Sequence, residues 1–126
     1  MAYKLLIVDD EADVCEFADN FFSKRKIEVI TAISGEEALN VVDKKRPNLI
    51  LLDIKMSGID GIETLRRLKE KNQQLKVIMV TGRKPEDDDS FQQCRQLGAV
   101  NYIHKPLELD ELENVVMSEL KEPKAK

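Results

Sequence analysis

Hydrophobic residues gather in five short runs along the chain, and each run is too brief to form a helix. The runs at 49–52 (Leu-Ile-Leu-Leu) and 77–80 (Val-Ile-Met-Val) contain no polar residue, which is typical of strands that are buried on both faces. The run at 4–8 is apolar after Lys4 and the run at 100–103 is shorter and mixed, whereas the run at 27–31 alternates. This alternation places three residues on one side of the strand: Ile27, Val29 and Thr31. The patterns together predict five strands.

Apolar residues between these strands recur at helical spacing, so we predict a helix with one buried face after each strand. The buried positions of the first, second, third and fifth helices are, in order, Val14, Phe17, Ala18 and Phe21; Ala38, Leu39, Val41 and Val42; Ile62, Leu65 and Leu68; and Leu109, Leu112, Val116 and Leu120. The fourth helix follows the polar loop 82–89 and ends at Gly98. Ser34 and Glu37 form a capping-box pattern that marks the start of the second helix, and Pro47 stops it. Strands that alternate with helices need right-handed crossovers and predict a parallel sheet covered on both faces.

Composition limits the class of protein. The chain has 126 residues, of which 42% are hydrophobic and 35% are charged, and this indicates one globular, soluble domain. We expect the domain to span residues 1–121, and residues 122–126 to form a charged tail or the start of a linker. The net charge of −4 and the lack of a basic stripe argue against a nucleic-acid surface. No apolar run has the length of a membrane span and no leader precedes the first strand, so we expect no membrane contact and a cytoplasmic location.

Polar residues that are far apart in the sequence come together at one edge of the predicted sheet. Parallel strands share a carboxyl edge, where open α/β sheets bind their ligands, and this edge collects Asp9, Asp10, Asp53, Thr81 and Lys105. Three carboxylates so close together repel, so either one of them holds a proton or a divalent cation neutralises them. Oxygen ligands without histidine favour Mg²⁺ or Mn²⁺ over zinc. The lysine and the threonine suit phosphoryl oxygens, and an aspartate can be the nucleophile that forms an aspartyl phosphate.

Each of these residues also has a simpler interpretation. The run Asp9-Asp10-Glu11 could cap the first helix, where carboxylates meet the positive end of the helix dipole. Thr81 could be an ordinary strand-end residue, and Tyr102 an ordinary aromatic residue of the core or the surface. His104 is the single histidine, and we interpret it as an exposed strand-end side chain and not as a ligand or phosphodonor. We interpret the aspartates at 87–89 as a solvated helix start. We interpret Cys15 and Cys94 as free thiols that are buried or half-buried.

In combination, these residues resemble the receiver domain of two-component response regulators, and the resemblance covers nearly the whole chain. Its motifs stand in order at the strand ends: Asp9-Asp10; Asp53 with Met56 and Gly61; Thr81-Gly82; and Lys105-Pro106. The resemblance implies a doubly wound α/β fold of the flavodoxin-like, three-layer type, in which five helices surround a five-stranded parallel sheet of order 2-1-3-4-5. The same sheet order is known for a member of this family.

The resemblance also implies roles for the residues at the carboxyl edge. Asp53 corresponds to the phosphate acceptor, which takes its group from the phosphohistidine of a sensor histidine kinase or phosphotransfer protein. Asp10, Asp53 and the backbone carbonyl of Lys55 would bind Mg²⁺ directly, and Asp9 would do so directly or through water. Lys105 would pair with the phosphoryl group. The expected protein is a signalling phosphoprotein that catalyses only its own phosphorylation and autodephosphorylation.

Other positions would convert phosphorylation into a signal. Thr81 would move toward the phosphoryl group and Tyr102 would turn inward in step, while Gly82 leaves room for the group. The face built from the fourth helix, fifth strand and fifth helix, roughly residues 86–120, would contact an effector or form a homodimer. Lys55 and Arg83 lie where the family modulates phosphate loss. A further departure is Ser57, which stands where the family often has proline.

Three other functions compete with this one. An aspartate-nucleophile phosphatase of the haloacid dehalogenase type needs Asp-x-Asp after the first strand, whereas this chain has Asp-Asp-Glu followed by Ala12. An FMN-binding protein would need a phosphate loop rich in Ser, Thr and Gly there, and the acidic pair would repel the phosphate. A receiver-like scaffold that is never phosphorylated remains the main alternative, although the intact Asp10, Asp53 and Lys105 argue against it.

Overall fold

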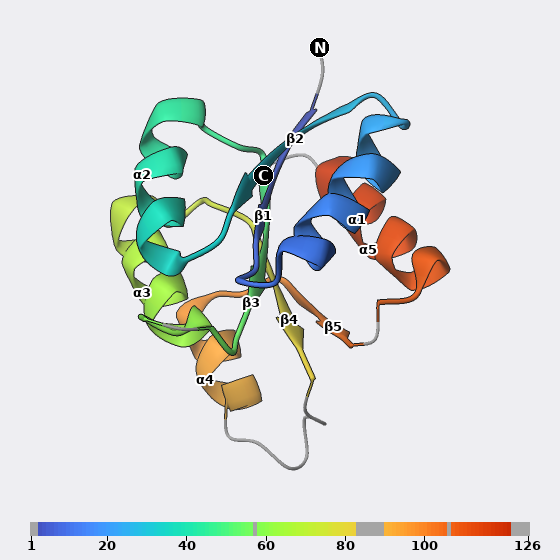
Figure 1. Ribbon diagram of the computed structural model, residues 1–126. Coiled ribbons are helices and arrows are strands. Elements are labelled where there is room, and N and C mark those ends of the chain that lie inside the picture. The colour runs from blue at the N-terminus through green and yellow to red at the C-terminus, as the bar shows by residue number, and fades with distance from the viewer. Residues whose placement is uncertain (1–2, 57, 83–89, 106, 122–126) are drawn as a thin grey trace.

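Strands and helices alternate strictly along the chain, as predicted (Figure 1). The computed structural model describes residues 3–56, 58–82, 90–105 and 107–121. Its elements are β1 (Tyr3–Val8), α1 (Ala12–Ser23), β2 (Ile27–Ala32), α2 (Gly35–Lys45), β3 (Leu49–Asp53), α3 (Gly61–Lys71), β4 (Val77–Thr81), α4 (Ser90–Leu97), β5 (Asn101–His104) and α5 (Leu109–Lys121). Within these described ranges, each helix is too short or too polar to span a bilayer.

All five strands are parallel and lie in the order β2-β1-β3-β4-β5. This confirms the predicted doubly wound sheet. Helices α1 and α5 cover one face, and α2, α3 and α4 cover the other (Figure 1). The order reverses between β1 and β3, so the connections that follow these two strands leave toward opposite faces. A crevice opens at such a point in this class of fold.

The sheet separates two hydrophobic cores, and β3 and β4 are buried along their whole length. The first core lies under α1 and α5 and includes Phe22, Ile103 and Leu112. The second lies under α2, α3 and α4 and includes Leu65 and Met79. The uninterrupted apolar runs at 49–52 and 77–80 therefore do form strands that are covered on both faces. Their alternate side chains enter opposite cores.

The predicted buried face of α1 is partly wrong. The helix buries Cys15, Ala18 and Phe22, whereas Phe17 is 40% exposed. Phe17 stacks on Phe21 with 6.4 Å between ring centroids, and Phe21 in turn packs against the first core. Both sets of apolar positions satisfy helical spacing, and periodicity alone could not choose between them.

Two smaller expectations also need correction. The alternation in β2 holds for Ile27 and Val29, which enter the first core, but Thr31 is exposed. Ala32 is buried in the second core instead, because this edge strand is covered on both faces. In α5, Leu109 is 46% exposed, while the other three predicted positions are buried. It belongs to the first turn, at the edge of the layer.

The predicted capping box at the start of α2 is present in a shifted form. The backbone N–H of Glu37 donates to Ser34 Oγ at 3.0 Å. The carboxylate of Glu37 reaches back to the N–H of Ile33 at 2.8 Å, one residue before the cap. Helix α3 has an equivalent cap, in which Asp60 Oδ1 accepts from the N–H of Glu63 at 2.9 Å.

Candidate functional site

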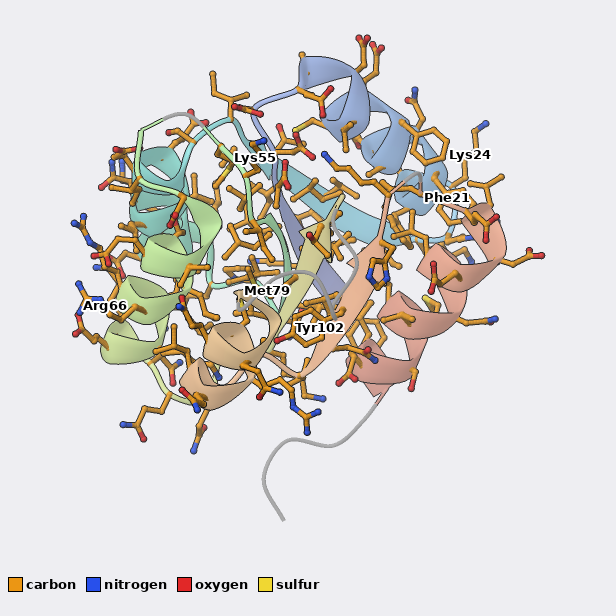
Figure 2. The ribbon with its side chains drawn as sticks, turned by 90° about the horizontal axis from the view of Figure 1, so that it is seen from below. Phe21, Lys24, Lys55, Arg66, Met79 and Tyr102 are labelled. Carbon is orange, nitrogen blue, oxygen red and sulfur yellow. The ribbon has the colours of Figure 1, made fainter. Side chains whose placement is uncertain are left out.

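The strand ends bring the predicted site residues to one edge of the sheet. In register, Val8 lies beside Leu52, so Asp9 and Asp53, the next residues of their chains, are neighbours at the carboxyl edge. Figure 2 shows the molecule from this edge, with Lys55 on the connection that leaves β3. Thr81 ends β4 beside His104 of β5. The register of the parallel sheet thus places the site.

Three carboxylates gather at this edge. One oxygen atom from each of Asp9, Asp10 and Asp53 lies within 4.8 Å of the other two. Asp9 is 2% exposed and Asp53 4% exposed, whereas Asp10 is open to solvent. Burying two carboxylates side by side is costly unless a cation compensates them. The donor set contains oxygen only and fits a hard divalent cation such as Mg²⁺.

Lys105 provides the positive charge of the site. Its Nζ lies 3.2 Å from Asp53 Oδ2, 3.3 Å from Asp9 Oδ2 and 3.1 Å from Glu11 Oε1. The backbone N–H of Lys105 donates to the carbonyl of Thr81 at 2.8 Å, which holds the lysine beside the end of β4. One ammonium group therefore faces several carboxylates, and the cluster keeps a surplus of negative charge.

The electrostatics of the cluster are visible in the pKa values of two groups. Burial raises the pKa of Asp53 above its ordinary value, and the charge of Asp9 raises it further, against the opposing effect of Lys105. Burial acts to lower the pKa of Lys105, but Glu11, Asp53 and Asp9 outweigh it, so that pKa rises. Lys105 is thus firmly charged, while the ionised form of Asp53 is disfavoured.

The connection after β3 holds Asp53 in place. The N–H of Lys55 donates to Asp53 Oδ1 at 3.3 Å, and the N–H of Gly61 donates to the carbonyl of Ile54 at 2.7 Å. A Cβ atom at Gly61 would clash with the backbone carbonyl of Asp53. Met56 fixes the other end of the turn by entering the second core. The spacing of Met56 and Gly61 after Asp53 therefore has a packing reason.

The two residues expected to switch lie on neighbouring strands. Thr81 is buried at the end of β4. Tyr102 on β5 packs against the second core, and Figure 2 shows its side chain beside α4. Burial raises the pKa of Tyr102 to about 12, and its hydroxyl group meets Cys94 and the backbone of Arg95. Tyr102 thus connects the sheet directly to α4.

Gly82 follows Thr81 directly and is exposed. No atom of the described residues lies within 4 Å of the position that a Cβ atom would take at Gly82. Packing against this part of the chain therefore does not require a glycine here, unlike at Gly61.

Some expectations differ from the structure or fall outside it. His104 is half-buried and not exposed, and its buried Nε2 has no hydrogen-bond partner within the described part of the chain. His104 lies beside Thr81 of β4 in the sheet register, and the neighbouring strand removes part of it from solvent. The described residues do not include Ser57, Arg83, the aspartates at 87–89 or Pro106.

Glu11 is the member of the site that sequence reasoning missed. The sequence suggested only a helix cap for it, and Glu11 is indeed the N-cap residue of α1, but its side chain makes no capping hydrogen bond. It pairs with Lys105 instead, a residue 94 positions away. Its position directly after the acidic pair was the available signal.

Comparison with known proteins agrees with this geometry. The chain matches the model of the response regulator receiver domain over residues 5–117. It is 37% identical over 116 residues to sporulation initiation phosphotransferase F of Bacillus subtilis, and the match covers 92% of each chain. It is 34% identical over 106 residues to the alkaline phosphatase synthesis transcriptional regulatory protein PhoP of the same organism, but covers only 43% of that protein.

Solved structures give the same answer. A CheY-like response regulator receiver domain protein from Methanospirillum hungatei superposes with a TM-score of 0.89 at 28% identity, covering 95% of this chain and 94% of that one. Proteins of this family are signalling modules and bind Mg²⁺ at an acidic pocket, and the cluster of Asp9, Asp10 and Asp53 lies at the corresponding edge. The chain therefore belongs to the response regulator receiver domain family of two-component systems.

Proposed function

We propose that this chain accepts a phosphoryl group on Asp53 from the phosphohistidine of a sensor histidine kinase or a phosphotransfer protein. In this step the phosphorus–nitrogen bond breaks, a bond forms between phosphorus and a carboxylate oxygen, and the imidazole keeps the electron pair. In autodephosphorylation, the oxygen of water attacks phosphorus and Asp53 leaves as a carboxylate. Inorganic phosphate and a proton are released. The chain turns over no other substrate.

The acid cluster supports Mg²⁺ as the cofactor of this reaction, with Mn²⁺ as a substitute. Asp10, Asp53 and the backbone carbonyl of Lys55 would hold the ion, and Asp9 would contact it directly or through water. When bound, such an ion would neutralise the carboxylates and offset the charge of the phosphoryl oxygens. Asp53 would then stay ionised and nucleophilic despite the burial that raises its pKa.

Lys105 and Thr81 are proposed to bind the phosphoryl oxygens. The transition state of phosphoryl transfer is loose, with its charge spread over the equatorial oxygens, so positioned cations and donors supply most of the stabilisation. The Lys105 ammonium group lies 3.2 Å from the acceptor carboxylate and is well placed for this role. Room for the phosphoryl group would be left by Gly82. We propose that Lys55 and Arg83 set the rate of phosphate loss.

The output surface is proposed to be α4, β5 and α5. Thr81 would move toward the phosphoryl group, and Tyr102 would change position in step. The contact between the Tyr102 hydroxyl group and α4 supports this coupling. If the tyrosine moves, it must either break this contact or displace α4. An effector protein or domain, or a second copy of the chain, would bind this surface.

One observation carries the proposal. Residues 9, 53 and 105 come from three separate strand ends, yet Lys105 Nζ lies within 3.3 Å of both buried carboxylates. A buried pair of carboxylates with a single lysine is an expensive arrangement for stability alone. The arrangement is well suited to binding a divalent cation and a phosphoryl group together.

The test is phosphorylation by a small donor. The protein is incubated with acetyl phosphate and Mg²⁺, and the intact protein is weighed. We expect one phosphoryl adduct, which is labile to hydroxylamine as an acyl phosphate should be. The adduct should be absent in Asp53→Asn and when EDTA replaces Mg²⁺. An unmodified mass for the wild-type protein, with Mg²⁺ and excess donor, would contradict the proposal and favour an unphosphorylated scaffold.

A further inference from the structure

The side chain of Glu11 binds Lys105 and does not cap α1, the helix that begins after it. As the N-cap residue of α1, it has an extended backbone, with φ −92° and ψ 111°, and its carboxylate could bind free amide groups of the first turn. It makes no such bond. Its Oε1 lies 3.1 Å from Lys105 Nζ instead, while its own N–H donates to Asp9 Oδ1 at 2.9 Å.

Two of the three carboxylates around Lys105 accept hydrogen bonds from its ammonium group, Glu11 Oε1 at 3.1 Å and Asp53 Oδ2 at 3.2 Å. A lysine Nζ has three N–H groups, and Asp9, Glu11 and Asp53 each place an oxygen within 3.3 Å of it. The contact with Glu11 draws the ammonium group toward α1 and competes with a phosphoryl oxygen for it. Glu11 is the partner that can be released most cheaply, because its side chain is 64% exposed and that of Asp9 is 3% exposed.

We propose that Glu11 is a positioning residue that holds Lys105 toward α1 in the unphosphorylated protein and releases it when the phosphoryl group arrives. The proposal rests on the role of Lys105 given above. Glu11 thereby lowers the rate of phosphorylation, because its contact competes with the transferring group for Lys105. An exposed ion pair of this kind corresponds to a factor of about twofold to fivefold in rate.

The test compares three single variants with acetyl phosphate as the donor and saturating Mg²⁺. Glu11→Gln removes the charge, and Glu11→Asp keeps the charge but shortens the side chain so that it no longer reaches Lys105. Glu16→Gln, an exposed site one turn along α1, removes an equal charge without touching the site. We expect both Glu11 variants to raise the maximal rate by about twofold to fivefold, and Glu16→Gln to leave it unchanged.

Separation of rate and affinity distinguishes positioning from general repulsion. Loss of a distant negative charge changes mainly the concentration of anionic donor that gives half the maximal rate. Release of Lys105 changes the maximal rate itself, because Lys105 acts on the group in transfer. Equal maximal rates in Glu11→Asp and the wild-type protein would overturn the proposal, as would an effect of Glu16→Gln equal to that of Glu11→Gln.

A second measurement needs no phosphorylation. In the metal-free protein, the Lys105 ammonium group should give a slowly exchanging proton–nitrogen signal by NMR, assigned by its loss in Lys105→Arg. The signal should exchange faster in both Glu11 variants and stay unchanged in Glu16→Gln. An unchanged signal in the Glu11 variants contradicts the contact. If the wild-type protein takes no phosphoryl group, while this signal behaves as expected, the proposed function fails and the contact stands.

Discussion

Asp53 shows how far single residues can be interpreted from the sequence. Its position at the end of a buried strand was enough to identify it, and the parallel register places Asp9 beside it. Glu11 was not identified because its partner, Lys105, is brought near only by the folded chain, and a cap explained it equally well. His104 was expected to be exposed because it ends a strand and has no partner in the sequence, but it is half-buried. The local sequence thus identified the charged residues of the site but not the ion pairs that they form.

Burial of Asp53 should make the stability of the fold depend on pH. Its pKa in the native state is raised above the ordinary value of 3.8, so between those two values the native state binds more protons than the unfolded state. Stability from this group is therefore present below pH 3.8 and is lost as the pH rises through the native pKa. Asp53→Asn should therefore stabilise the metal-free protein at pH 7.

The measurement is urea unfolding in EDTA at several pH values. The difference between Asp53→Asn and the wild-type protein should shrink as the pH falls toward 4. Glu16→Gln serves as the control for removal of an exposed charge. A difference that is independent of pH would mean that ionisation of Asp53 is not what costs stability.

Helix α1 shows the limit of periodicity at the scale of an element. Strand type, order and approximate ends were predictable, because uninterrupted apolar runs and capping residues are strong signals. The orientation of α1 about its axis was not, because Phe17 and Phe22 lie on overlapping apolar stripes. The choice depends on which ring the first core accepts. That core encloses Phe22, whereas Phe21 packs against its margin with the Arg25 guanidinium 3.7 Å from the centre of its ring.

Paired substitutions in α1 test its corrected orientation. Phe22 is fully buried, so Phe22→Ala should destabilise the protein by about 3–5 kcal/mol through lost burial and a new cavity. Phe17→Ala removes a ring that is 40% exposed and stacks on Phe21, and should cost about 1 kcal/mol. Urea unfolding of the two variants gives the comparison. Equal losses, or a larger loss for Phe17→Ala, would show that the helix is rotated toward the orientation that periodicity suggested.

At the scale of the whole molecule, the alternation of elements predicted a parallel sheet, and the family resemblance carried by four short motifs implied the order of its strands. Handed crossovers leave few arrangements for five alternating units, and the site then follows from the common edge of the strands. The distribution of charge across that edge could not be predicted, since it depends on distances of a few ångströms between side chains from different strands.

Mg²⁺ should stabilise the whole fold through the acid cluster. A ligand that binds only the native state adds RT ln(1 + [L]/Kd), or about 1.4 kcal/mol at ten times Kd. Thermal unfolding with increasing Mg²⁺ should show a rising midpoint for the wild-type protein and a much weaker rise for Asp10→Asn. The exposed Glu16→Gln should behave like the wild-type protein. A midpoint that is insensitive to Mg²⁺ in the wild-type protein would argue against a metal at this site.

The two cysteines lie on opposite sides of the sheet, Cys15 in the first core and Cys94 in the second. Both are shielded, and burial raises the pKa of the Cys15 thiol to about 11, so an alkylating reagent finds little thiolate in the closed protein. Each sulfur therefore becomes reactive only when its own layer opens. The rate at which each cysteine is alkylated therefore measures how often its own core opens. Comparison of the alkylation rates of Cys15 and Cys94 would show which of the two cores opens more readily, without any added label.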